Sequence, residues 1–80
     1  MLLAPFTLAE DDPARSEKES ALRALSEADL LTLYRQTRLL AAAATRAHDM
    51  PQLLPMVRGM KTIQRIAAER GLIIRREKRA

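Results

Sequence analysis

The sequence predicts an all-α protein, and three observations point to that class. The chain of 80 residues has no tryptophan and only two aromatic side chains, Phe6 and Tyr34, so its core must be aliphatic. Leucine, isoleucine, methionine and alanine suit close helix packing, whereas β-sheets favour β-branched and aromatic residues. Two long segments also repeat apolar residues every three or four positions, which is the helical period. Eighty residues accommodate one domain at most.

We interpret residues 1–15 as a flexible arm that precedes the helical domain. Pro5 and Pro13 flank an acidic patch there, and no apolar period is sustained. The alternative is a short linear segment that packs on a partner or on a neighbouring copy, through Leu2, Leu3, Phe6 and Leu8.

The helical domain is expected to span residues 16–74 and to start with a short helix. Ser16 and Glu19 have the spacing of a capping box, which predicts a helix from residue 16 to about residue 25. Ser26 and Asp29 repeat that signature. Serine and aspartate prefer caps to helix interiors, so we expect a break at Ser26 and a new helix after it.

The second helix is expected over residues 27–47. One stripe of this helix is apolar or small and should face the core: Leu30, Leu33, Tyr34, Thr37, Leu40, Ala41 and Ala44. Four further apolar residues lie away from that stripe: Leu31, Leu39, Ala42 and Ala43. A helix with so little polar surface is usually covered on more than one side. We therefore predict that these four residues contact another copy of the chain or a larger partner protein.

The third helix is the most strongly patterned segment and is expected over residues 53–71. Asp49 and Gln52 can cap it, Pro51 suits a first helical turn, and Gly71 supplies a left-handed residue at its end. Its apolar face consists of Leu53, Met56, Met60, Ile63 and Ala67, and its charged face of Arg58, Lys61 and Arg65. The short connection at residues 48–51 predicts that the second and third helices run antiparallel.

The end of the chain has two parts. Leu72, Ile73 and Ile74 are expected to form a brief strand or a clasp across the two helices. Residues 75–80 follow as a basic tail.

Charge is distributed unevenly along the chain. Residues 1–34 carry three Lys or Arg and seven Asp or Glu, a net charge of −4, whereas residues 35–80 carry eleven and three, a net charge of +8. Such a division indicates a polyanionic partner or head-to-tail contact between copies.

Several kinds of chemistry are not expected from these residue types. The chain has no cysteine and one histidine, which excludes the common zinc sites, and its two glycines cannot form a glycine-rich phosphate loop. His48 beside Asp49 could form a dyad, but we interpret His48 as a solvated residue at a helix end, where a cation is favoured. We therefore expect a protein without enzymatic activity, cofactor or metal. No apolar run reaches the length of a membrane span and no secretory signal is evident, so a cytoplasmic location is expected.

Two segments resemble known families. The Ala-rich helix, the turn with Asp49 and the Leu-rich helix over residues 30–66 resemble the oligomerisation hairpins of small terminase subunits in tailed phages. That resemblance implies ring assembly and a role in loading DNA into a packaging motor. Residues 62–76 are similar to the recognition helix and first wing strand of winged-helix regulators, which implies DNA binding through that helix.

Two function classes follow from these patterns. In the first, a helical assembly module holds nucleic acid by its phosphates without reading its sequence. The predicted contacts are Arg58, Lys61, Arg65, Arg75, Arg76 and Arg79. In the second, the protein is an adaptor, in which the second helix and the N-terminal arm dock on a larger partner. The charge of residues 35–80 favours the first class, while the lack of aromatic residues between the basic ones excludes stacking on single strands.

Overall fold

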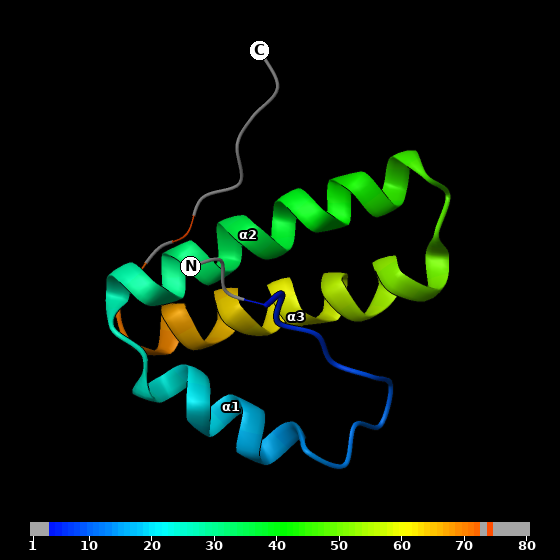
Figure 1. The fold of residues 1–80 in the computed structure, drawn as a ribbon. Helices are drawn as coiled ribbons and strands as arrows, with labels where there is room; N and C mark the ends of the chain where they lie inside the picture. Colours follow the sequence, from blue (N-terminus) through cyan, green and yellow to red (C-terminus); the bar gives the residue numbers. More distant parts are fainter. Residues whose placement is uncertain (1–3, 73, 75–80) are drawn as a thin grey trace.

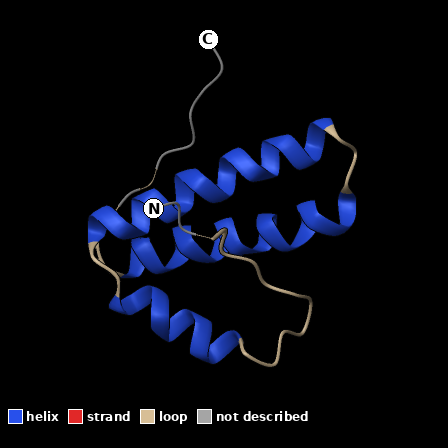
Figure 2. Cartoon of the chain, viewed as in Figure 1, coloured by secondary structure: helices blue, strands red, loops and turns tan. Residues whose placement is uncertain are grey.

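The computed structural model describes residues 4–72 and 74, which form three α-helices (Figure 1). Helix α1 spans Arg15–Ala24, α2 spans Glu27–Arg46 and α3 spans Met50–Glu69. No strand occurs within that described part of the chain, so the predicted all-α class is confirmed (Figure 2). Within the same residues, no helix has both the length and the apolar character needed to cross a lipid bilayer.

Helix α3 lies at the centre of the fold. Helix α2 turns back through residues 47–49 into α3, and the two helices lie side by side, while α1 packs against α3 (Figure 1). The main cluster of buried side chains joins all three helices: Leu22, Leu30, Leu33, Tyr34, Ile63, Ile66 and Ala67. A smaller cluster of Ala41, Ala44 and Met56 continues toward the α2–α3 turn. Burial of these aliphatic side chains stabilises the fold by roughly 25 cal/mol for each Å² removed from water.

Three helix ends form as the local sequence predicts. The Ser26 side chain accepts a hydrogen bond from the Asp29 amide at the start of α2, and Asp49 accepts one from the Gln52 amide at the start of α3. Gly71 has a φ of 78°, and its amide and that of Leu72 donate to the carbonyls of Ala68 and Ala67. This pair of bonds is a Schellman motif, in which a left-handed glycine satisfies the last carbonyls of a helix.

The predicted capping box of Ser16 and Glu19 is wrong. Helix α1 begins at Arg15, so Ser16 already lies inside the first turn, and Ala14 at the cap position provides no side-chain hydrogen bond. Asp12 organises the turn before the helix instead, since its carboxylate accepts hydrogen bonds from the amides of Ala9 and Ala14. Similarly, α3 begins at Met50, three residues before the predicted start.

The interpretation of residues 1–15 as a flexible arm does not hold for residues 4–15. Residues 4–14, here called the N-terminal segment, pack on the helices, and Leu8 has no exposed surface. The Phe6 amide donates to the Thr37 hydroxyl of α2 at 3.0 Å, and the Leu8 amide donates to the Pro55 carbonyl of α3 at 3.0 Å. These bonds supply polar partners that a packed segment without secondary structure needs. Residues 1–3 lie outside the described part.

The C-terminal end forms no strand at the described residues 72 and 74. Leu72 and Ile74 pack against the main core cluster. Thr62 and Ile66, which lie in the helix compared with a winged-helix recognition helix, are buried. Ile73 and the basic tail at residues 75–80 lie outside the described residues.

Gly59 should be indispensable for the contact between α3 and the N-terminal segment. A Cβ atom at this position would overlap the carbonyl oxygen of Phe6. Alanine favours helices by about 1 kcal/mol over glycine, but overpacking costs about 1–3 kcal/mol. We therefore expect Gly59→Ala to lower the free energy of unfolding and to speed hydrogen exchange at the amides of Phe6 and Leu8.

The control for this substitution is Ala68→Gly, at an exposed position of the same helix. It should change stability through helix propensity alone and leave exchange at Phe6 and Leu8 unchanged. A Gly59→Ala variant that is more stable than the natural chain, with both amides still protected, would contradict the close approach.

Candidate functional site

The site with the clearest chemical character is a basic hollow where α1 begins beside α3. It has a volume of about 240 Å³ and is lined by Arg15, Arg58, Lys61, Thr62 and Arg65. The last four come from α3, where spacings of three and four residues bring Arg58, Lys61 and Arg65 to one side of the helix. The structure therefore brings together the three α3 cations that the sequence predicts as nucleic-acid contacts, and it adds Arg15.

Arg58 and Lys61 are the least neutralised cations of the hollow. The closest acid to Arg58 is Glu10 at 3.7 Å, whose side chain is 83% exposed, so this pair contributes little. The Arg58 guanidinium also donates a hydrogen bond to the Leu8 carbonyl at 3.4 Å. Lys61 is exposed and makes no ion pair with any described residue. Both side chains are available to an anion.

Arg65 has partners within the fold, which the sequence pattern did not indicate. It donates to Glu19 of α1 at 2.9 Å and pairs with Glu69 of α3 at 3.2 Å. Glu19 also accepts a hydrogen bond from Arg15 at 2.9 Å. Arg23 forms ion pairs with both Glu19 and Glu69. The bond to Glu19 is the largest cause of a raised Arg65 pKa, and the bonds from Arg65 and then Arg15 lower the pKa of Glu19. The network links α1 to α3 at the edge of the hollow.

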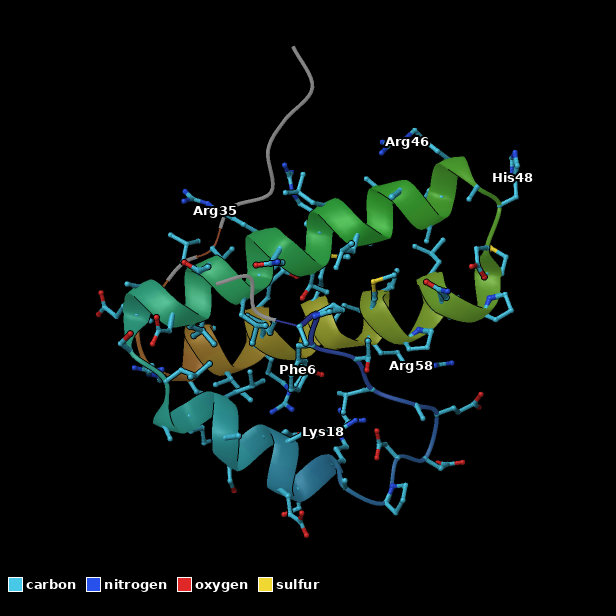
Figure 3. The ribbon with its side chains drawn as sticks, viewed as in Figure 1. Phe6, Lys18, Arg35, Arg46, His48 and Arg58 are labelled. Atoms are coloured by element: carbon cyan, nitrogen blue, oxygen red, sulfur yellow. The ribbon has the colours of Figure 1, made fainter. Side chains whose placement is uncertain are left out.

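Arg15 is the site residue that sequence reasoning missed. The position of Arg15 depends on the turn before α1. There the Asp12 carboxylate accepts hydrogen bonds from the Ala14 amide at 2.9 Å and from the Lys18 ammonium at 2.8 Å. Lys18 also donates to the Thr7 carbonyl at 3.0 Å, so it ties α1 to the N-terminal segment (Figure 3). An aspartate that accepts a hydrogen bond from the amide two residues later is a common turn signal, and Asp12 was the available clue in the sequence.

The remaining cations do not join the hollow. Arg35 and Arg46 project from α2, on the side of the molecule away from Arg58 (Figure 3). The predicted contacts Arg75, Arg76 and Arg79 lie outside the described residues. The structure therefore separates the cations of the concave site from Arg35 and Arg46 on α2.

The four predicted interface residues differ in exposure. Leu39, Ala42 and Ala43 are exposed on α2, with Leu39 at 66%. Leu31 is only half-buried and lines a small hollow of about 160 Å³ together with Leu30, Leu72 and Ile74 of the same chain. Other large apolar side chains are exposed near the α2–α3 turn: Leu40, Met50 and Leu54. The prediction that Leu40 faces the core is wrong, because the buried stripe of α2 passes through Ala41 and Ala44 and leaves Leu40 41% exposed.

No protein-family model, curated protein or solved structure matches this chain. Within the described residues, no group of three or more histidine, aspartate or glutamate side chains is placed to hold a metal ion. The basic hollow and the exposed apolar residues are therefore the features of the molecule from which a function can be inferred.

Acid should weaken the fold through Asp12 and Glu19. Hydrogen bonds from Lys18, then from the amides of Ala14 and Ala9, lower the pKa of Asp12 from 3.8 to about 2. The pKa of Glu19 is lowered as well. Because both carboxylates hold protons less tightly when folded, their contribution to stability is present near neutral pH and is lost as pH falls. For Asp12 this loss runs from about pH 4 toward pH 2.

We expect Asp12→Asn to lower the melting temperature at pH 7 and to reduce its dependence on acid. Thermal melts at pH 7, 4 and 2.5 measure both effects. Asp11→Asn is the matched control, because Asp11 has a φ of 54°, a left-handed conformation that asparagine also adopts. Equal melting temperatures for the two variants at every pH would contradict the role of Asp12.

Proposed function

We propose that this protein is a small helical assembly module that contacts nucleic acid through its phosphates, without reading the base sequence. The observation that carries the proposal is the convergence of four cations, Arg15, Arg58, Lys61 and Arg65, around one hollow. Guanidinium and ammonium groups are the side chains that bind phosphate oxygens best. Phosphate contacts position a nucleic acid but carry no sequence information.

The chemistry of the hollow favours this mode over stacking on bases. Its lining has no aromatic residue on which a base could stack. Seven residues separate Arg58 from Arg65, about 10 Å along a helix at 1.5 Å per residue. A row of that length fits several successive charges of a duplex, which carries one charge per about 3.4 Å of each strand.

Assembly is the second part of the proposal. Leu39, Leu40, Met50 and Leu54 are between 41% and 66% exposed and lie in the halves of α2 and α3 that adjoin their turn. We call these four residues the apolar end. A core without tryptophan is small, and cores of this size seldom supply more than about 3–5 kcal/mol. We propose that a second copy of the chain covers the apolar end.

The alternative function is that of an adaptor, in which the apolar end docks on a larger protein. The 66% exposure of Leu39 favours it, because a partner protein could bury this apolar side chain. The N-terminal segment would not supply docking residues in this case, since residues 4–14 pack on the helices. Under the adaptor proposal the basic hollow meets solvent or an acidic protein surface.

A cytoplasmic location and a role in loading DNA, as the terminase resemblance implies, are further parts of the proposal. The DNA-loading role is supported by two features, a phosphate-compatible hollow and exposed apolar side chains. Ring formation would place several hollows around one duplex and add their weak contacts.

Titration of labelled duplex DNA tests the first part of the proposal. We expect micromolar affinity at 50 mM salt and much weaker binding at 200 mM salt, because counterions are released from the phosphates. Replacing both Arg58 and Lys61 by alanine should weaken binding and reduce the log–log salt slope by about 0.9 for each lost phosphate contact.

The matched control replaces Arg35 and Arg46 by alanine, which removes the same charge from α2. These residues lie away from Arg58 (Figure 3), so binding should change much less. Equal loss in both double variants, or no binding by the natural chain at 50 mM salt, would contradict the hollow as a phosphate site.

Sedimentation velocity at micromolar concentration tests the second part. We expect a species larger than the 9.0 kDa chain, and we expect Leu40→Glu with Leu54→Glu to convert it to monomer with unchanged helix content. Arg35→Glu on the same α2 helix serves as the control and should leave assembly intact. A folded monomer of the natural chain would refute assembly and favour the adaptor.

A further inference from the structure

We propose that Glu19, which pairs with Arg15 and Arg65 at the edge of the basic hollow, competes with a phosphate group, and that the phosphate enters by displacing the Glu19 carboxylate from both arginines. The inference rests on the proposed function, since the hollow and the class of ligand are the same. It adds a competing group within the chain, and therefore a means by which the fold itself sets the affinity for anions.

The geometry at Glu19 carries this inference. One carboxylate oxygen, Oε2, accepts from Arg15 Nε at 2.9 Å and from an Arg65 guanidinium nitrogen at 2.9 Å. The other oxygen lies 3.5 Å from Arg23. Two guanidinium groups that converge on one oxygen form the arrangement that also binds a phosphate oxygen. The Glu19 side chain is 14% exposed and therefore within reach of solvent ions.

The other two cations of the hollow explain why a phosphate could compete. Arg58 has only the exposed Glu10 as an acidic partner, and Lys61 has no ion pair in the described part of the chain. Glu19 neutralises one side of the hollow and leaves the other side positive. A phosphate bridging both sides gains contacts with Arg58 and Lys61 that the single carboxylate does not make.

The fold can release Glu19 without releasing α1. Leu22 of α1 is 1% exposed and belongs to the main core cluster, and Lys18 ties α1 to Asp12 and to the Thr7 carbonyl. The Arg65 side chain can therefore exchange Glu19 for a ligand while the helix stays docked. Because Glu19 is attached to the same chain, it competes at a high effective concentration and lowers the affinity of the natural protein.

The test compares Glu19→Gln with Glu17→Gln in the full chain. Both substitutions lie on α1 and remove one negative charge, but Glu17 is exposed and makes no ion pair among the described residues. Each variant is titrated with labelled duplex DNA and, separately, with inorganic diphosphate. We expect Glu19→Gln to bind both probes about two- to fivefold more tightly than Glu17→Gln, a gain typical of removing a partly exposed competing ion pair.

A third variant, Glu19→Gln combined with Arg65→Gln, separates displacement from a general loosening of α1. If the gain arises because Arg65 is freed to bind the ligand, the double variant loses it. Circular dichroism melts confirm that each variant is folded at the temperature of the titration.

The outcomes distinguish the inference from the proposed function. Tighter diphosphate binding by Glu19→Gln without DNA binding by any variant supports the inference and overturns the nucleic-acid proposal. DNA binding that is equal in Glu19→Gln and Glu17→Gln overturns the inference and leaves the proposed function in place. Absence of binding to both probes in all variants overturns both.

Discussion

The burial of α3 on two sides is the constraint on which the rest of the structure depends. Ile63 and Ile66 have no exposed surface, and both belong to the cluster that joins α3 to α2 and to α1. Gly59 on the same helix allows the Phe6 backbone to approach closely. Since α2, α1 and the N-terminal segment occupy these sides, the charged residues of α3 are confined to what remains. That confinement gathers Arg58, Lys61 and Arg65 at one hollow.

The same packing pairs the acidic and basic parts of the chain, so the uneven charge along the sequence is largely balanced within the fold. The acidic first part of the chain lies against the basic α3, where Glu19 pairs with Arg65 and Arg23 pairs with Glu69. Residues 4–72 and 74 together carry ten Lys or Arg and nine Asp or Glu, a net charge of +1. Under the proposed function, attraction of a polyanion by this part would depend on the local excess of positive charge in the hollow, where the polyanion would compete with the chain's own carboxylates.

Local signals predicted the helices well, and contacts between distant segments escaped prediction. Ser26, Asp49 and Gly71 act on amides or carbonyls within a few residues, so their spacing alone revealed them. Leu8 was interpreted as part of a flexible arm. Its amide donates a hydrogen bond to the Pro55 carbonyl of α3, and no local pattern around Leu8 indicates a contact with so distant a residue. The α3 cations of the hollow followed from helical spacing, whereas Arg15 joined them only through the docking of α1 on α3.

The most direct test of the central role of α3 compares Ile63→Asp with Lys61→Asp by circular dichroism melts. The two positions are neighbours on one helix, but Ile63 is fully buried and Lys61 is exposed. An unpaired charge in an apolar core costs several kcal/mol, which exceeds the free energy of unfolding that a small core can lose while it stays folded. Ile63→Asp should lose the cooperative transition while Lys61→Asp keeps it. Similar cooperative melts for both variants would contradict the proposed facing of α3.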